Sequence, residues 1–331
     1  MNALFEGFAR VWTAVALSSE LKPGAPLAVQ VAGTGVVLFR DKANTVRALV
    51  DRCPHRGVAL SLGKVRDGCI ECPFHGWRLD GTGQVCHVPW NPDTKRDTLQ
   101  GVAVPARELA GQLWIYTAAG EEAPTEPAVH EALLRPGVRV SGGAIVWNTH
   151  WTRAMENMLD WPHLPFVHTN TIGKSMVGQA SSRMDITWED RPWGAHTHIA
   201  IDGKAEPGSL DLRWPNQMNL HIPIPNKLLM MCVTCVPLDA QRTRMILTMA
   251  RDFLTLPLFD YFFHRTNLRI ANEDKAIVES SRPSEVPRPG DERSVRTDAV
   301  TLAFRKRYFA ELHGSSSEAP AGPKGRLPVL G

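Results

Sequence analysis

Two short segments of this 331-residue chain decide how the rest of it is interpreted: Cys53-Pro54-His55-Arg56-Gly57 and Cys72-Pro73-Phe74-His75-Gly76-Trp77. Each segment holds one cysteine and one histidine together with a proline and a glycine, a composition typical of tight loops. Thiolates and imidazoles are ligands for transition metals. The two segments, separated by fourteen residues, therefore predict a four-ligand metal site formed by two loops that meet at their tips.

The predicted ligands Cys53, His55, Cys72 and His75 are compatible with two kinds of metal site. Structural zinc accepts two cysteines and two histidines, but a zinc finger takes its cysteines from one element and its histidines from another. In a two-iron, two-sulfur cluster of the Rieske type, two histidines replace two cysteines on one iron. One cysteine and one histidine from each loop fits that arrangement, with both cysteines on one iron and both histidines on the other.

Composition and charge argue against several other classes of protein. The net charge is 37 minus 34, or +3, and no basic stripe interleaved with aromatic residues is present, so we expect no nucleic-acid partner. No apolar run reaches the roughly 18 residues needed to cross a bilayer, and no secretory signal is evident, so we expect a cytoplasmic protein with no membrane partner. Cys69, Cys86, Cys232 and Cys235 are expected to be small buried side chains.

The pattern of short strands and turns predicts a small all-β domain over residues 1–118. A linker rich in Ala, Glu and Pro follows it, and residues 119–313 are expected to form a second, α+β domain. There, antiparallel strands, one of them running from Leu210 to Ile222, precede a long helix over Leu258–Ser281. The tail 314–331, rich in Ser, Gly, Pro and Ala, is expected to be disordered.

A second metal site is predicted within Asn157-Met158-Leu159-Asp160-Trp161-Pro162-His163-Leu164-Pro165-Phe166-Val167-His168. In a regular helix His163 and His168 would point about 140° apart. Both reach one metal only where the helix is distorted, and Pro162 and Pro165 provide that distortion. Two histidines and one carboxylate that leave open positions form the facial triad of non-haem Fe(II) oxygenases.

The carboxylate of that triad must come from later in the chain, where five acidic residues are candidates: Asp252, Asp260, Glu273, Asp274 and Glu279. Helical periodicity predicts that Asp274 shares an apolar stripe with Phe263, Ile270 and Ile277, whereas Glu273 lies on a polar face. Burying a carboxylate on an apolar stripe is costly unless a cation accompanies it. We therefore expect Asp274 to be the third ligand, with Glu273 as the open alternative.

Both motifs, about ninety residues apart, resemble those of the ring-hydroxylating Rieske non-haem iron oxygenases, and the resemblance covers nearly the whole chain. It implies a β domain carrying the [2Fe-2S] cluster and a helix-grip-like catalytic domain, an antiparallel sheet plus a long helix, carrying mononuclear Fe(II). It also implies that Asp160, preceded by Asn157 as in the family, hydrogen-bonds an iron histidine and a cluster histidine. In the family that cluster belongs to a neighbouring subunit, so a homotrimer is expected.

The function implied by the resemblance is that of a terminal oxygenase which uses O2 and electrons from NAD(P)H. The chain has no Gly-rich dinucleotide fingerprint, so a separate flavin reductase, with or without a ferredoxin, is the expected electron donor. The length favours hydroxylation or oxidative demethylation of an apolar or aromatic substrate, and arene cis-dihydroxylation is the alternative. Two other classes of protein remain as alternatives: an electron-transfer protein with an inert second domain, and a ligand-binding module.

Overall fold

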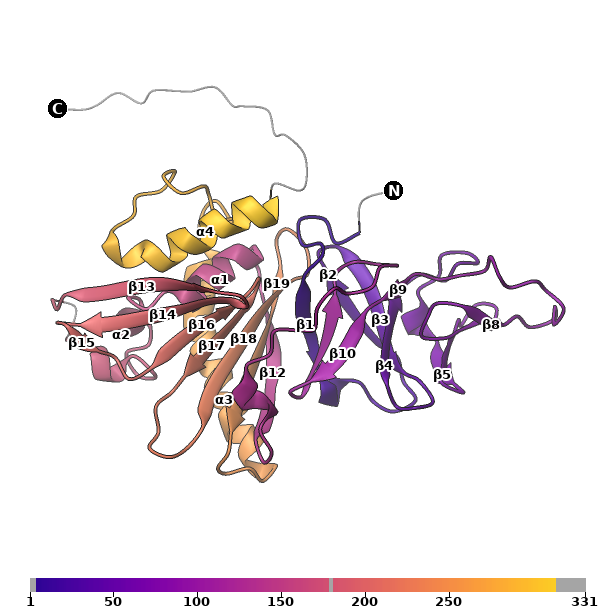
Figure 1. Ribbon diagram of the computed structural model, residues 1–331, viewed down its shortest axis with the longest axis horizontal. Helices are drawn as coiled ribbons and strands as arrows, with labels where there is room; N and C mark the ends of the chain where they lie inside the picture. Colours follow the sequence, from indigo (N-terminus) through magenta and orange to yellow (C-terminus); the bar gives the residue numbers. More distant parts are fainter. Residues whose placement is uncertain (1–3, 179–180, 314–331) are drawn as a thin grey trace, which may run out of the picture.

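The computed structural model describes residues 4–178 and 181–313. The segment 314–331, for which disorder is predicted, lies outside the described residues. Strands from the first third of the chain occupy one end of an elongated molecule, and a large sheet with its helices occupies the other (Figure 1). This is the predicted α+β architecture, while the domain boundary at residue 118 stays a prediction.

Residues 12–116 form three small antiparallel sheets. The first has the order β1-β11-β10, the second β2-β3-β4-β9 and the third β5-β6-β7-β8. Their strands are β1 (Trp12–Leu17), β2 (Leu27–Val31), β3 (Thr34–Arg40), β4 (Val46–Val50), β5 (Lys64–Arg66), β6 (Cys69–Glu71), β7 (Arg78–Leu79), β8 (Val85–His87), β9 (Ala103–Val104), β10 (Ala106–Leu109) and β11 (Gln112–Tyr116). Between β2 and β3, Ala32 and Gly33 both adopt positive φ (45° and 75°), the backbone of a tight hairpin turn.

The second half of the chain builds one eight-stranded antiparallel sheet with the order β12-β19-β18-β17-β16-β14-β13, and β15 pairs with β14. Its strands are β12 (Arg139–Trp147), β13 (Met184–Arg191), β14 (Gly194–Ile201), β15 (Lys204–Ala205), β16 (Ser209–Arg213), β17 (Gln217–His221), β18 (Leu229–Pro237) and β19 (Thr243–Arg251). The single strand expected over Leu210–Ile222 is wrong. The chain reverses at Trp214–Asn216, so that Leu212 pairs with Met218, because Pro215 has no N–H to donate to a ladder.

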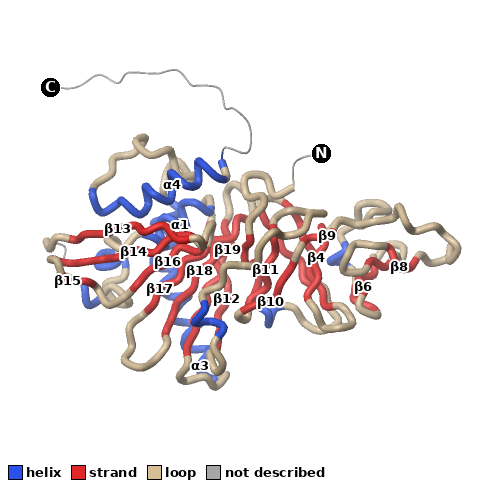
Figure 2. Tube along the Cα trace, in the orientation of Figure 1, coloured by secondary structure: helices blue, strands red, loops and turns tan. Residues whose placement is uncertain are grey.

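The helices pack mainly against one face of this sheet (Figure 2). They are α1 (Trp151–Leu159), α2 (Leu164–Val167), α3 (Leu258–Glu279) and α4 (Ala299–Glu311), and the short 3-10 turns are η1 (Ser18–Glu20), η2 (Leu60–Leu62), η3 (Glu131–Leu134), η4 (Lys174–Met176) and η5 (Arg296–Asp298). α1 lies against β17 and β18, and α3 lies against β12 and β19. The predicted long helix is thus confirmed, and it stands beside α1 over the sheet.

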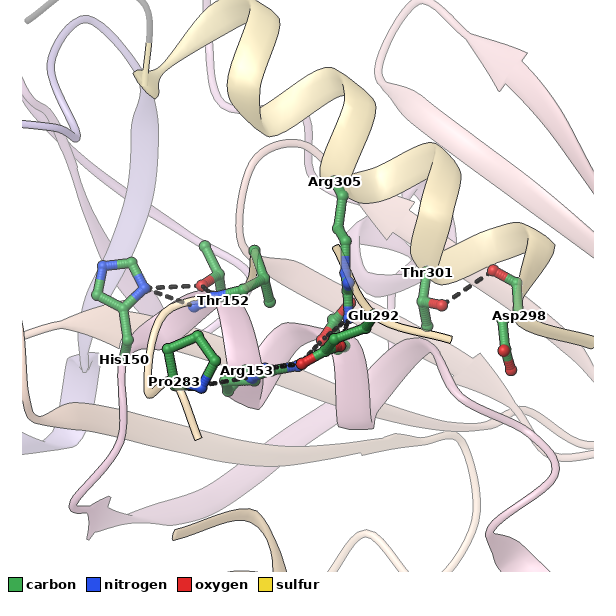
Figure 3. A network of polar contacts seen from close by, with 10 residues as sticks. His150, Thr152, Arg153, Pro283, Glu292, Asp298, Thr301 and Arg305 are labelled. Carbon is green, nitrogen blue, oxygen red and sulfur yellow. Dashed lines mark hydrogen bonds and ion pairs between the residues drawn. The ribbon is translucent and has the colours of Figure 1, made fainter. Parts of the chain in front are cut away.

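An ion-pair network that is buried except at Glu292 holds α4 against α1 (Figure 3). Arg153 of α1 binds Glu156 (2.9 Å) and Glu292 (2.6 Å), and Arg305 of α4 binds the same two carboxylates. Two arginines and two glutamates balance in charge, so the network satisfies groups that would be costly to bury alone. It anchors the helix whose C-terminal end leads into the second predicted metal motif.

Hydrogen bonds join the sheet of β1 and β11 to the large sheet. Gln112 of β11 donates to Thr248 of β19 (3.2 Å), and Asn216 donates to Thr13 of β1 (2.9 Å). All four side chains are buried. Among the described residues, no helix combines the length and the apolar composition required to cross a bilayer.

Candidate metal centres

The two loops that carry the first predicted ligand set have the same backbone hydrogen bonds. In the first loop the amide of Cys53 donates to the carbonyl five residues later (2.8 Å), and the amide of Gly57 donates back to Cys53 (2.9 Å). In the second loop Cys72 and Gly76 repeat both bonds at 2.8 and 3.0 Å. The two glycines have φ of +72° and +70°, a backbone that favours glycine. The loops are therefore two copies of one ligand-presenting turn.

Burial separates the two kinds of ligand in these loops. The Cys53 and Cys72 side chains are buried, whereas His55 is exposed and His75 is half-buried. The two imidazole rings lie 4.6 Å apart, and His55 stacks on Trp77 at 4.4 Å. Two inner thiols and two outer imidazoles fit a [2Fe-2S] cluster whose histidine-bound iron faces a redox partner.

The acid–base properties of these ligands also fit a metal site. Burial raises the pKa of the Cys53 thiol to about 11 when no cation is present. Partial desolvation, together with His75 and Arg56, lowers the pKa of His55 and favours the neutral imidazole that binds metal. Cluster assembly would therefore release protons from the thiols.

The second predicted ligand set comes together between α1, α2 and α3. His163 and His168 flank the four-residue helix α2, and Asp274 lies on α3. Nε2 of His163 lies 3.2 Å from Nε2 of His168, and Oδ1 of Asp274 lies 3.6 Å and 3.2 Å from these two atoms. Ligands about 2.1 Å from an octahedral metal lie about 3 Å from each other. The three atoms thus have the spacing of a facial triad.

Each imidazole of this set is oriented through its other nitrogen by a carboxylate. Oδ2 of Asp160 lies 3.0 Å from Nδ1 of His163 and accepts its backbone N–H at 3.1 Å. Oε2 of Glu273 lies 2.8 Å from Nδ1 of His168 and accepts the hydroxyl of Thr171 at 2.6 Å. Such partners set the tautomer that directs Nε2 toward a metal. Burial disfavours charge on His168, but the nearby carboxylates of Asp274 and Glu273 raise its pKa overall.

Asp274 itself supports a cation at this position. Its side chain is 2% exposed, and its Oδ1 has no hydrogen-bond partner among the described residues. The groups nearest to that oxygen are two imidazoles, which carry no charge in the form that binds metal. A buried carboxylate without a compensating charge is strongly disfavoured. The donor set of two histidines and one carboxylate fits mononuclear non-haem iron.

A small, mostly apolar pocket opens beside these three ligand atoms, with a cavity volume of about 50 Å³. Its walls come from α1, α2, α3 and the strands β16–β18. The apolar lining residues are Met158, Leu164, Ile172, Leu210, Met218, Leu220, Met231 and Ile270. Two buried donors among the lining residues, Asn157 Nδ2 and Trp161 Nε1, have no partner in the described part of the chain.

The remaining sequence-based expectations have mixed outcomes. Glu273 lies on a polar face as expected, with Arg269 3.4 Å from its carboxylate. The same carboxylate also reaches His168, a contact across 105 positions that no local pattern reveals. On the expected stripe Asn267, Ile270 and Asp274 are buried, whereas Ile277 is exposed and Val278 is buried in its place. The other acidic candidates have partners elsewhere: Asp252 accepts from Leu228, Asp260 from Arg139 and Arg251, and Glu279 from Asn148.

Residues 11–103 match the Rieske [2Fe-2S] domain, and residues 225–312 match the vanillate O-demethylase oxygenase C-terminal domain. The methylxanthine N1-demethylase NdmA of Pseudomonas putida is 28% identical over 313 residues, which are 89% of this chain and 85% of that protein. Its structure with caffeine superposes with a TM-score of 0.80 at 25% identity and covers 92% of both chains.

Chlorophyllide a oxygenase of Chlamydomonas reinhardtii is 25% identical over 303 residues, 82% of this chain but 43% of that protein. The chain spans about half or less of the length of the first curated relatives it matches. The matched domain confirms the predicted Rieske cluster, and the related oxygenases support mononuclear iron as the second cofactor. With this domain pair and this fold, the chain is similar over nearly its whole length to the Rieske non-haem iron oxygenases.

Proposed function

We propose that the protein is the terminal oxygenase of a multicomponent Rieske system and that it hydroxylates or oxidatively demethylates an apolar or aromatic substrate. The observation that carries this proposal is the convergence of His163 Nε2, His168 Nε2 and Asp274 Oδ1 beside an apolar pocket. An electron-transfer protein has no need of such a pocket. The similarity to a methylxanthine demethylase over 89% of the chain supports demethylation or hydroxylation as the reaction type.

The residues proposed to hold the cofactors are those of the two ligand sets. Cys53, His55, Cys72 and His75 would hold the [2Fe-2S] cluster, and His163, His168 and Asp274 would hold the mononuclear iron. Bound iron supplies the activation of O2 that organic side chains cannot perform. The protein's part is to leave open positions on that iron, to orient both imidazoles and to keep water out of the pocket.

The polar groups of the pocket indicate what kind of substrate it would accept. None of the described lining residues is a lysine or an arginine, so a charged carboxylate or phosphate would enter without a counter-charge. Asn157 Nδ2 and Trp161 Nε1 are unpaired donors, and a substrate carbonyl, ether or ring nitrogen could accept from them. We propose a small, uncharged, mostly apolar substrate with one hydrogen-bond acceptor near the group that is oxidised.

Asp160 is proposed as a positioning residue between the two metal centres. Its Oδ2 already binds His163, and its carboxylate is 27% exposed, which leaves an oxygen accessible to a further donor. The small sheet β5–β8, which carries the second cluster loop, and helix α2 lie toward opposite ends of the molecule (Figure 1). Such a separation favours electron transfer from the cluster of a neighbouring copy, and we propose a homotrimer in which this contact closes a ring.

The remaining proposals concern organisation and partners. We retain a cluster-bearing domain over residues 1–118 and a catalytic domain over residues 119–313. We also retain a flavin reductase, with or without a ferredoxin, as the electron donor and the cytoplasm as the location. Pull-down of a reductase from the native organism and cell fractionation would test the last two points.

Iron content and oxygen consumption test the central proposal together. The purified protein is expected to hold three irons per chain and to consume O2 with a surrogate reductase when a substrate is present. Asp274→Ala should retain two irons and the visible absorption of the cluster but lose substrate-triggered O2 uptake. Asn272→Ala, exposed on the same helix, is the matched control and should behave like the unchanged protein.

Two results would overturn this reading. Two irons per chain in the unchanged protein would leave an electron carrier, and full turnover by Asp274→Ala would remove Asp274 from the iron site. Product analysis then separates the reaction types: formaldehyde indicates demethylation and a monohydroxylated product indicates hydroxylation. A cis-dihydrodiol would replace the proposal with the alternative dioxygenase function.

A further inference from the structure

Two cysteines outside the proposed cluster ligands lie in contact on the small sheet that carries the second cluster loop. Cys69 begins β6, and Cys86 lies in β8 on the far side of β7. Their Sγ atoms are 3.1 Å apart, and no disulfide joins them. Cys86 is exposed and Cys69 is half-buried, so the expectation that both are small buried side chains is wrong. The same expectation is confirmed for Cys232 and Cys235, which are buried.

A β-bulge explains how two cysteines on non-adjacent strands meet. In the pairing of β7 with β8, Arg78 lies opposite His87 and Leu79 lies opposite Val85, so Cys86 is the extra residue. A bulged residue is left out of the ladder, and its side chain is re-aimed. Here the Cys86 sulfur lies 3.4 Å from the carbonyl oxygen of Arg78 and reaches across β7 to Cys69.

We propose that Cys69 and Cys86 are a reversible dithiol–disulfide pair, a modification site for small-molecule disulfides such as oxidised glutathione. A disulfide requires an S–S distance of about 2.05 Å, so the two sulfurs need to approach by only about 1 Å. The other four cysteines are buried, and Cys53 and Cys72 among them are the proposed cluster ligands. Cys86 is thus the one exposed thiol in the described chain, and its partner is already in place.

The exchange proceeds in two balanced steps. The Cys86 thiolate attacks one sulfur of oxidised glutathione, which breaks the glutathione S–S bond and releases one glutathione thiolate. The Cys69 sulfur then attacks the Cys86 sulfur of the mixed disulfide and releases the second glutathione. The two cysteines lose two electrons and two protons, and one oxidised glutathione becomes two reduced glutathiones.

The order of attack follows from the environment of the two thiols. Cys86 is exposed, whereas Cys69 is half-buried. Burial and the neighbouring Cys86 raise the pKa of the Cys69 thiol to about 12, which makes it a poor first nucleophile. Cys69 therefore acts as the resolving cysteine, which attacks only after Cys86 is modified.

The disulfide would close the segment 69–86 into a ring that contains Cys72 and His75. A covalent ring restricts the opened states of the segment it encloses. Oxidation of the pair is therefore expected to slow opening of the second cluster loop, and hence loss of the cluster, without supplying a ligand. The inference concerns cluster retention and does not depend on which substrate the oxygenase acts on.

The test uses the full-length holoprotein, first reduced and freed of reductant under anaerobic conditions. Oxidised glutathione is added, free thiols are alkylated in denaturant, and peptides are mapped by mass spectrometry. The expected result is a Cys69–Cys86 cross-link that dithiothreitol reverses, with unchanged visible absorption of the cluster. Loss of that absorption under a ferrous chelator should be roughly three- to tenfold slower in the oxidised form.

Variants separate the two sulfur roles and control for the buried thiols. Cys69→Ser should stop at a stable glutathione adduct on Cys86, whereas Cys86→Ser should take up no glutathione. Cys232→Ala is the matched control and should still form the cross-link. The mapping on unchanged protein needs no variant, so a failure of either serine variant to fold leaves the proposal testable.

Two outcomes would overturn the proposal. The first is an unchanged protein that keeps both thiols free, or stops at a glutathione adduct on Cys86, under excess oxidised glutathione. The second is equal cluster loss in cross-linked and reduced protein, which would remove the stabilising role. Neither outcome affects the iron count or the oxygen uptake on which the proposed function depends.

Discussion

Removing the carboxylate of Glu273 should weaken iron binding at the second centre although Glu273 is not a proposed ligand. Its Oε2 lies 2.8 Å from Nδ1 of His168 and also accepts the hydroxyl of Thr171. This contact holds the imidazole so that Nε2 faces Asp274 and raises the basicity of that nitrogen. The loss of such a partner typically costs ten- to a hundredfold in metal affinity, or about 1.4 to 2.7 kcal/mol.

The two variants at this position should differ in a predictable way. Glu273→Gln keeps an oxygen that can accept from Nδ1 and loses only the charge, so we expect about a tenfold weaker affinity. Glu273→Ala loses both the charge and the acceptor, and about a hundredfold weaker affinity is expected. Competition between the protein and a ferrous chelator measures this affinity directly, with the visible absorption of the cluster as an internal standard.

The control must separate an effect on iron from an effect on folding. Asn272→Ala changes the neighbouring, exposed position of α3 and should leave iron affinity unchanged. The Tm of the iron-free Glu273→Gln protein should remain within a few degrees of the unchanged protein. Unchanged iron affinity in Glu273→Ala would refute the reasoning, because the imidazole of His168 would then need no partner to face the metal.

Three further predictions address the relay, the helix anchor and a buried histidine. Asp160→Asn should keep both metals but nearly abolish electron transfer between them in stopped-flow single turnover, and normal turnover would contradict the bridging role. Arg305→Met leaves Arg153 as the shared partner of the Glu156 and Glu292 carboxylates, so that one negative charge is uncompensated. This change should cost about 3 to 5 kcal/mol in urea unfolding, whereas the exposed Lys306→Met should cost under about 0.5 kcal/mol. Burial lowers the pKa of His150 from 6.5 to about 4, so on acidification the unfolded chain protonates this imidazole before the folded protein does. The free energy of unfolding should therefore fall by about 2 kcal/mol between pH 8 and pH 5. His150→Asn keeps an acceptor for the Thr152 amide and should remove that part of the pH dependence, as measured by Tm.

Local signals explain why the cluster loops and most strands could be predicted from the sequence. Asp274 as a candidate ligand follows from helical periodicity combined with the cost of burying a carboxylate. The break at Pro215 was also a local signal, because a proline inside a strand argues against a continuous ladder. A strand predicted over Leu210–Ile222 therefore overlooks the turn that separates β16 from β17.

The features that could not be predicted depend on contacts between distant positions. Glu273 faces His168 because α3 lies beside α2 in space, and helical periodicity alone assigns Glu273 to a polar face. Cys86 meets Cys69 because a bulge shifts the β7–β8 register by one residue, and residue pattern does not encode that shift. Both cases concern polar side chains near a metal centre, where tertiary contacts outweigh local preference.

The proposed iron ligand differs from the other buried acidic residues in the charged groups that pair with its carboxylate. Three acidic residues are buried in the described chain: Glu156, Asp211 and Asp274. Glu156 binds two arginines, and Asp211 binds Arg213 and an imidazole. Asp274 is the most buried of the three and has no arginine or lysine partner. An unpaired buried charge costs several kcal/mol, and the other two buried acids are compensated by arginine. This contrast supports the proposal that Asp274 pairs with a bound cation, and the two imidazoles beside it favour a transition metal such as iron over a hard cation such as Mg²⁺.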